Sequence, residues 1–319
     1  MVATGKDVAG SMPPGVRMRC VMAQSIGSRI FGLVIRLMRL KRQMSDPQRV
    51  QKILDDARTA GPQPYVMSAK LKLASKVDQT TESGMQVYTF TPAGQPTRAA
   101  VLYLHGGAYI YQASDFHWQL IDALCQKMGA TIVAPLYPKI PFASAADAYA
   151  AVEPLYRRMV DRYGSAALQV MGDSAGGGLA LGLIQRMRDQ GVALPTRVVA
   201  LSPWVDVTMS NPAIAALESG DQVLSSHGLQ VFGALWAGSE DLREPHISPL
   251  YGDMTGLCPL VVIAGGREIF VPDIVAFCAK ARAAGVPVTE RVYAGMMHAF
   301  PVFPMPEAKH AVEEIVMSS

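Results

Sequence analysis

The most constraining feature of this chain is a regular alternation of short apolar runs with longer segments of helical periodicity. The runs are rich in Val, Ile and Leu, which is typical of strands buried on both faces of a parallel sheet. The expected strands are Gln86–Phe90, Ala99–Leu104, Thr131–Leu136, Leu168–Met171, Val198–Leu201, Leu260–Ala264 and Thr289–Tyr293. The clearest expected helices are Ser144–Tyr163, Ala175–Gln190, Ile274–Ala284 and Glu307–Val316. This alternation predicts an α/β fold, with a mainly parallel central sheet and helices on both faces.

Two stretches interrupt the alternation. Residues 1–70 have helical patterns and precede the first strand, whereas residues 205–251 separate two strands. We expect both to form a helical cap over the carboxyl edge of the sheet, where open α/β sheets hold their ligands. The predicted organisation is an N-terminal cap segment, residues 1–70, and a main domain, residues 71–319, with residues 205–251 as a second cap segment.

The amino-terminal region is basic and amphipathic. Residues 1–52 hold ten Lys or Arg against Asp7 and Asp46, in a chain whose net charge is +3. Large apolar residues recur among these arginines at near-helical spacing, at Ile26, Ile30, Phe31, Leu33, Val34, Leu37 and Leu40. Such a helix could bind a membrane surface or an acidic partner, or cover a pocket as a lid. We favour the lid, because burial of several large side chains outweighs the screened attraction of a few arginines to lipid.

The sequence also argues against a membrane-spanning protein, a disulfide-rich protein and a metal-binding or nucleotide-binding protein. No run of eighteen uninterrupted apolar residues is present, so no spanning helix or stable membrane insertion is expected. The cysteines at positions 20, 125, 258 and 278 form no C-x-x-C pair, which argues against a disulfide framework or a zinc site. We expect no cofactor, no metal and no nucleic-acid partner, because motifs for metal or nucleotide binding are absent from the sequence. A cytoplasmic location is the simplest expectation.

A candidate nucleophile lies in the sequence Gly172-Asp173-Ser174-Ala175-Gly176. It follows an expected strand and opens an expected helix, the context that the G-x-S-x-G elbow requires. A serine on so sharp a turn needs neighbours without bulky side chains, which Gly172 and Gly176 provide. The alternative is a glycine-rich turn that packs closely or cradles a phosphate.

A candidate oxyanion loop follows the strand Ala99–Leu104 and reads His105-Gly106-Gly107-Ala108-Tyr109. Adjacent glycines let backbone amides approach a developing negative charge, which is a large term in acyl-transfer catalysis. We expect the donors to be Gly106, Gly107 and Ala175, the residue after the nucleophile. A simple tight turn would not explain why this loop precedes an elbow in the expected order.

A base and an acid should follow in the order serine, acid, histidine. His298 lies in a loop after the last expected strand, whereas His310 lies within a helical pattern, so His298 is preferred. The acid should follow the strand Leu260–Ala264. Glu268 is preferred there, because Asp273 begins a helix behind a proline and is placed to cap it.

Together these motifs resemble the hormone-sensitive-lipase-like family of bacterial carboxylesterases, in the branch whose elbow reads G-D-S-A-G. The resemblance runs from about Val87 to the end of the chain and includes Leu201–Asp206, Ile247–Leu250 and Ala283–Val288. It implies an α/β-hydrolase fold with a helical cap and hydrolysis of short to medium acyl esters without a cofactor. The implied catalytic residues are Ser174, Glu268 and His298, and we expect Tyr109, Asp173 and Trp204 to contact the ester substrate.

Two departures from the family pattern affect these expectations. Ala108 replaces the third glycine of the oxyanion loop, which suggests a tighter far end with the donors intact. The stretch Tyr137–Pro141 is shortened, which puts any pocket contact from it in doubt. A lactonase or an amidase with the same residues remains open. A small-molecule receptor on this scaffold would lose the histidine, which is present here. The sequence leaves the oligomeric state open, a homodimer included.

Overall fold

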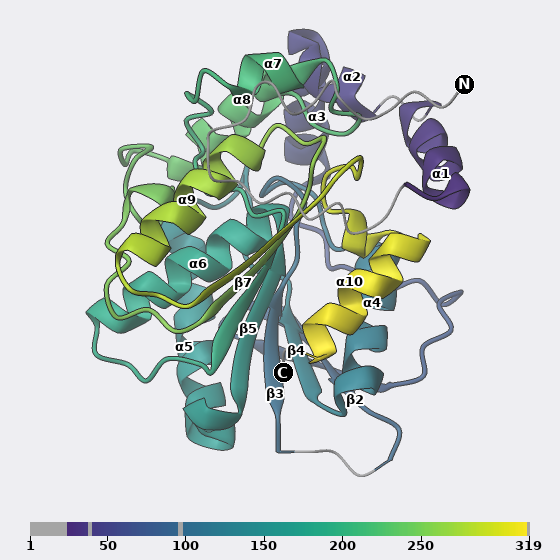
Figure 1. Cartoon of the computed structure of the whole chain (residues 1–319). Helices are drawn as coiled ribbons and strands as arrows, with labels where there is room; N and C mark the ends of the chain where they lie inside the picture. The colour runs from purple at the N-terminus through teal and green to yellow at the C-terminus, as the bar shows by residue number, and fades with distance from the viewer. Residues whose placement is uncertain (1–23, 38–39, 95–97, 318–319) are drawn as a thin grey trace.

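A central eight-stranded sheet organises the protein, and a computed structural model describes its residues 24–37, 40–94 and 98–317. Helices cover both faces of the sheet (Figure 1). The strands are β1 Lys76–Glu82, β2 Met85–Thr91, β3 Ala100–Leu104, β4 Thr131–Pro135, β5 Leu168–Asp173, β6 Arg197–Leu201, β7 Leu260–Gly265 and β8 Val288–Tyr293. The helices are α1 Ile26–Leu37, α2 Leu40–Ser45, α3 Pro47–Ala60, α4 Asp115–Met128, α5 Ala145–Tyr163, α6 Ser174–Asp189, α7 Ile214–Glu218, α8 Ser226–Ala237, α9 Val271–Ala283 and α10 Pro306–Met317.

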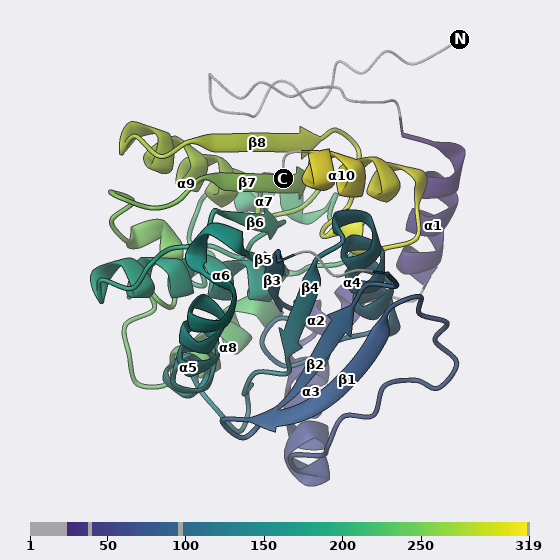
Figure 2. The ribbon, with the colours of Figure 1, turned by 90° about the horizontal axis from the view of Figure 1, so that it is seen from below.

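The strand order is β1-β2-β4-β3-β5-β6-β7-β8. All neighbours from β4 to β8 are parallel, whereas β1 and β2 pair in antiparallel fashion at one edge. The expected α/β fold with a mainly parallel sheet is therefore confirmed. Figure 2 shows the twist of this sheet and the helices packed against it.

The buried strands explain why the sequence pattern was informative. Every residue of β3 is buried, and successive residues enter different cores. Leu102 and Leu104 pack into one hydrophobic cluster, whereas Val101 and Tyr103 pack into the cluster on the opposite face. A strand with apolar neighbours on both sides needs an uninterrupted apolar run.

Each of the seven expected strands is present within one or two residues of its expected bounds. The sequence pattern missed β1, whose sequence is polar and whose residues are largely exposed. This strand pairs only with β2, through a hairpin that ends at Glu82 and Met85. An edge strand of this kind has no apolar face to bury, so periodicity does not reveal it.

Helices from two distant parts of the chain lie together beyond the carboxyl ends of the strands (Figure 1). They are α2 and α3 from the amino-terminal region, and α7 and α8 from the insertion between β6 and β7. The contact is close, since a Cβ atom on Gly228 of α8 would lie 2.7 Å from the carbonyl oxygen of Met44. Val50 and Leu54 of α3 are buried in the same core. Residues 1–23 of the expected cap segment lie outside the described residues.

Helix α1 does not pack as its sequence pattern predicts. Its buried residues are Ser28, Gly32 and Ile35. The large aliphatic side chains expected to cover a pocket are exposed instead, at Ile26, Ile30, Leu33, Val34 and Leu37. On the other side of the helix, Ile35 is buried, and Phe31 is partly buried against Phe116 and Phe303. The expected lid packing is therefore wrong for α1, because the helix buries Ser28, Gly32 and Ile35 and leaves its aliphatic stripe in solvent.

The remaining expectations on the fold concern cysteines and membrane spans. Cys125, Cys258 and Cys278 are buried and free, and Cys20 lies outside the described residues. Within residues 24–37, 40–94 and 98–317, no helix combines the length and the apolar character needed to cross a bilayer.

Candidate active site

Ser174 lies at the junction between β5 and α6, with a positive φ of 51°. Such a conformation is strained for a residue with a side chain. The flanking glycines permit it, because a Cβ atom on Gly172 would lie 2.4 Å from the Gly176 carbonyl oxygen. A Cβ atom on Gly176 would lie 2.1 Å from the carbonyl oxygen of Leu104. The steric reason inferred from the sequence therefore holds in atomic detail.

The structure brings Ser174, His298 and Glu268 together. The Ser174 hydroxyl lies 2.8 Å from Nε2 of His298, and Nδ1 of His298 contacts Oε2 of Glu268 in a short hydrogen bond. His298 comes from the loop after β8, and Glu268 from the loop after β7. A histidine that donates through Nδ1 has a lone pair on Nε2 for the hydroxyl proton.

Glu268 is fully buried and held at both oxygens. Oε1 accepts the amide of Gly265 at 3.1 Å, and Oε2 faces His298. Burial raises the pKa of the Glu268 carboxyl despite the opposing effect of His298. For His298, burial alone would lower the pKa, but Glu268, Asp221 and Asp173 together outweigh it, and the pKa is raised above its ordinary value. The pair is therefore arranged to stabilise an imidazolium.

A second buried carboxylate, Asp221, lies near this pair and was not anticipated from the sequence. Its negative charge raises the pKa of both His298 and Glu268. Its Oδ2 accepts the amide of Ile269 at 3.0 Å, and its Oδ1 accepts the amides of Val223 and Leu224. Asp221 thus joins the insertion between β6 and β7 to the loop that carries Glu268. Its position after a Gly in a polar turn gave no signal of this role.

Asp273, the alternative acid, lies elsewhere. It occupies the first turn of α9 and accepts a hydrogen bond from Asn211 Nδ2 at 2.7 Å. The expected capping role is wrong, since Phe270 is the N-cap of α9 and makes no side-chain cap bond. His310, the alternative base, lies in α10 and faces Glu314 at 3.7 Å.

The backbone amides of the candidate oxyanion loop differ in whether they already donate a hydrogen bond within the protein. The amide of Gly106 donates to Oδ1 of Asp173 at 3.0 Å, so it is engaged within the protein. Across the described chain no hydrogen bond is made by the amides of Gly107 or Ala108. Ala175 lies in the first turn of α6, where amides have no intrahelical acceptor. Ala108 adopts a φ of 51°, so it tolerates the conformation that a third glycine would take more easily.

Asp173, an expected substrate contact, instead fastens the oxyanion loop to the elbow. It is 2% exposed and also accepts the Tyr103 hydroxyl at 2.9 Å and faces His117 Nε2 at 3.2 Å. Burial alone would raise the pKa of Asp173, but His117 and these hydrogen bonds hold it below its ordinary value. A buried carboxylate with several donors is a rigid link between two loops.

Tyr109 and Trp204, the other expected substrate contacts, belong to a column of stacked rings. Trp236 of α8 stacks on Tyr109 with centroids 3.8 Å apart, and Tyr109 stacks on Trp204 at 5.4 Å. Trp204 stacks on Phe270 at 5.8 Å, and Phe270 meets His298 edge-on at 5.2 Å. Tyr109 and Trp204 are almost completely buried. Tyr109 and Trp204 therefore pack within a column of rings that runs from α8 to His298.

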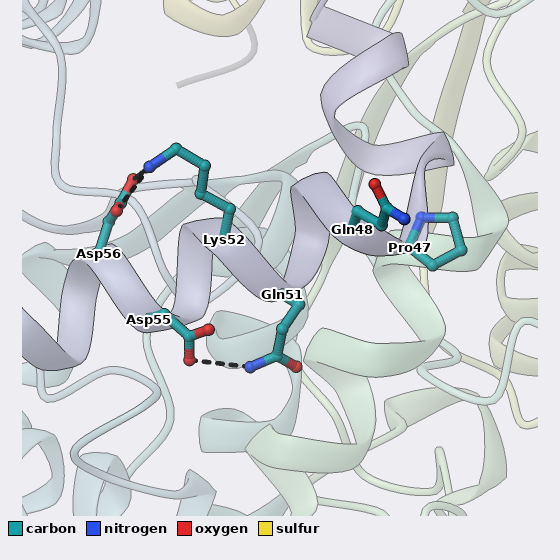
Figure 3. Close-up of a pocket in the computed structure, with 6 residues that line it drawn as sticks. All are labelled: Pro47, Gln48, Gln51, Lys52, Asp55 and Asp56. Atoms are coloured by element: carbon teal, nitrogen blue, oxygen red, sulfur yellow. Dashed lines mark hydrogen bonds and ion pairs between the residues drawn. The ribbon is translucent and has the colours of Figure 1, made fainter.

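One surface hollow lies beside the candidate oxyanion loop, and another lies on α3. One of about 970 Å³ borders the end of the oxyanion loop, and Ile110 and residues 137–141 line it, so the shortened stretch does face a cavity. The other lies on the exposed face of α3, where Lys52 pairs with Asp56 and Gln51 with Asp55 (Figure 3). That second hollow holds no nucleophile or base. No cluster of potential metal ligands occurs in the part of the chain that the structure describes.

The sheet order and the serine, histidine and carboxylate at its carboxyl edge define the class of α/β hydrolases. Residues 101–302 match the alpha/beta hydrolase fold family. An acetyl-hydrolase of Streptomyces hygroscopicus is 35% identical over 70% of this chain and 75% of its own. A Staphylococcus aureus structure provisionally described as an esterase is 31% identical, with a TM-score of 0.82 over 86% of this chain and 92% of its own. A hormone-sensitive lipase from a metagenome library is 25% identical, with a TM-score of 0.77 over 92% and 98%.

The chain therefore belongs to the hormone-sensitive-lipase-like family of esterases and lipases within the α/β hydrolases. The resemblance inferred from the sequence motifs is confirmed. The protein is a hydrolase of the esterase and lipase type.

Proposed function

We propose that this protein cleaves short to medium acyl carboxylic esters with Ser174 as nucleophile, His298 as base and Glu268 as acid. The observation that carries the proposal is the continuous hydrogen-bonded line from the Ser174 hydroxyl through His298 to Glu268. Glu268 and His298 lie 94 and 124 positions after Ser174 in the sequence, and the three residues meet at one edge of the sheet. Such convergence is what nucleophilic catalysis requires.

In the acylation step, Nε2 of His298 takes the proton of the Ser174 hydroxyl as Oγ attacks the ester carbonyl carbon. His298 then gives this proton to the leaving alcohol. Glu268 holds the imidazole ring with Nδ1–H toward its carboxylate and stabilises the positive charge of the intermediate. A water molecule then attacks the acyl-enzyme, with His298 again as base, and the carboxylic acid leaves.

The negative charge on the carbonyl oxygen needs amide donors. We assign this role to the amides of Gly107, Ala108 and Ala175, because that of Gly106 is engaged by Asp173. Asp173 then acts on the reaction indirectly, since it holds the oxyanion loop against the elbow. Preorganised donors of this kind contribute about 3 to 4 kcal/mol each to transition-state stabilisation.

The cap helices support a limited substrate size. We propose that α2, α3, α7 and α8 form the cap, because they lie over the carboxyl edge and bury Met44, Val50 and Leu54 against the core. Ser174 is 7% exposed and His298 is 4% exposed, so both side chains are almost shielded from solvent. A receptor without catalysis is disfavoured, because His298 is present and correctly oriented.

The test compares Ser174→Ala and His298→Ala with His310→Ala as a matched control. Because a triad acts as a unit, we expect each of the first two changes to lower kcat on the order of a million-fold, with an unchanged melting temperature. His310→Ala should retain wild-type turnover on p-nitrophenyl esters. If His298→Ala keeps more than a few per cent of the activity, the base is wrongly assigned. A fluorophosphonate should label the wild type at Ser174.

A further inference from the structure

Helix α1 carries an apolar stripe that faces solvent. The stripe consists of Ile26, Ile30, Leu33, Val34 and Leu37, which are 77, 60, 57, 45 and 71% exposed. With 3.6 residues per turn, these side chains occupy an arc about 100° wide. Half of the ten exposed large apolar side chains in the described part of the chain lie on this one helix. Contiguous exposed apolar surface of this kind marks an interaction site.

The opposite face of α1 is fixed to the protein, so the stripe is held outward. The amide of Ser25 donates to Oε1 of Glu307 in α10 at 2.7 Å, and the Ser28 hydroxyl donates to Oε2 of the same carboxylate. A Cβ atom on Gly32 would lie 2.9 Å from Oε1 of Gln222. Figures 1 and 2 both show α1 at the outer edge of the molecule.

The charged residues that flank the stripe in the sequence are all basic. Between Asp7 and Asp46 the sequence holds no Asp or Glu, and Arg29 and Arg36 are exposed beside the stripe. Next to α1 lies a basic hollow of about 400 Å³, which includes Arg36, Lys41, Arg42 and Arg267 in its lining. Among the described residues, none of these four cations forms an ion pair.

The one carboxylate of the basic hollow does not neutralise it. Asp221 is 3% exposed, and its two oxygens accept the amides of Val223, Leu224 and Ile269. The hollow therefore presents mainly positive charge to an incoming group. An anion with several acceptor oxygens, such as a phosphate, matches a cluster of arginines.

We propose that the α1 stripe and the basic hollow together form a docking surface for an anionic lipid bilayer. The aliphatic side chains would enter the boundary between headgroups and acyl chains, and the basic residues would contact the lipid phosphates. At twelve residues, α1 is about 18 Å long and lies flat on the surface rather than across it.

A second copy of the chain fits this surface less well. Pairing two stripes would bring Arg29 and Arg36 of both copies together, and no carboxylate from residues 8–45 would offset their repulsion. A lipid surface supplies the missing negative charge. Because Arg267 directly precedes Glu268, docking would also place the bilayer on the side of the molecule where the loop that carries Glu268 lies.

The experiment measures co-sedimentation of the full-length protein with vesicles of phosphatidylcholine alone or mixed with phosphatidylglycerol. It uses the Ser174→Ala background, so that the result does not depend on the proposed chemistry. We expect binding to the mixed vesicles that weakens at high salt, since lipid charge is screened. Ile30→Gln/Leu33→Gln/Leu37→Gln and Arg29→Glu/Arg36→Glu should each lower the partition coefficient by about tenfold or more. Glutamine preserves helix propensity.

Matched controls change exposed positions outside α1. Val66→Gln/Met317→Gln removes two exposed apolar side chains, and Arg157→Glu/Arg162→Glu reverses two charges on α5, and both should bind as the parent does. With Ser174 restored, the α1 variants should hydrolyse a soluble ester at the wild-type rate, which verifies folding. Absence of binding to the mixed vesicles, or equal binding by the α1 variants, would overturn the proposal. A dimer in analytical ultracentrifugation that the glutamine variant dissociates would also overturn it, in favour of a second copy.

Discussion

His298 lies between carboxylates from two parts of the chain. Glu268, in the loop after β7, contacts Nδ1 of His298. Asp221, in the insertion between β6 and β7, raises the pKa of His298 through its negative charge. Asp173 adds a smaller effect from the elbow. The direct contact belongs to Glu268, whereas three backbone amides hold the Asp221 carboxylate. The geometry therefore distinguishes the carboxylate that contacts His298 from the one that acts on its pKa without a hydrogen bond to it.

The first residue-level prediction concerns the identity of the acid. Glu268→Gln should lower kcat far more than Asp273→Asn, because only Glu268 fixes the ring and charge of His298. In triads of this kind the loss is on the order of 10⁴-fold. Asp273→Asn should change kcat by less than about threefold, because its carboxyl contacts Asn211 and makes no hydrogen bond to His298. Steady-state kinetics of both variants decide, and the reverse ranking would assign the role to Asp273.

The second residue-level prediction concerns pH. His298 must be neutral to accept the Ser174 proton, so kcat/KM should rise with pH as His298 loses its own proton. Because Glu268, Asp221 and Asp173 raise the pKa of His298 against the effect of burial, the midpoint should lie above about 6.5. In Glu268→Gln the largest of these effects is lost, so the midpoint should move to lower pH. A wild-type midpoint at or below the ordinary histidine value would contradict this account.

At the scale of elements, two amino-terminal helices with apolar periodicity behave differently. Helix α3 buries Val50 and Leu54 in the core beneath α8. Helix α1 buries Ser28, Gly32 and Ile35, and its two small residues allow the close approach to Glu307 and Gln222. Periodicity reveals that one face of a helix differs from the other, but it does not reveal which face meets the protein.

This difference predicts unequal stability effects for the same substitution. Leu54→Ala should lower the free energy of unfolding by about 2 to 5 kcal/mol, since Leu54 is 3% exposed and the change leaves a cavity. Leu33→Ala should change it by less than about 0.5 kcal/mol, because Leu33 is 57% exposed. Urea unfolding of both variants measures the contrast. Similar midpoints for the two would mean that α3 is not docked as described.

At the scale of the whole molecule, the proposed cap helices and the carboxyl edge of the sheet form one packed unit. The ring column from Trp236 through Tyr109, Trp204 and Phe270 ends at His298. Asp221 adds a hydrogen bond between the insertion that separates β6 from β7 and the loop that carries Glu268. Stacked and hydrogen-bonded groups of this kind hold a catalytic geometry more firmly than loops alone. The α1 stripe lies outside this packed unit and remains exposed.

The sequence by itself determined the sheet, the elbow and the order of the candidate triad. Buried parallel strands require apolar runs, and a serine such as Ser174 on a strained turn requires glycines beside it, so both leave local patterns. Only the tertiary structure decided that Glu268, and not Asp273, faces His298, that Asp173 engages the Gly106 amide, and that α1 turns its aliphatic face outward. These outcomes depend on contacts between residues far apart in the chain, which no local pattern records.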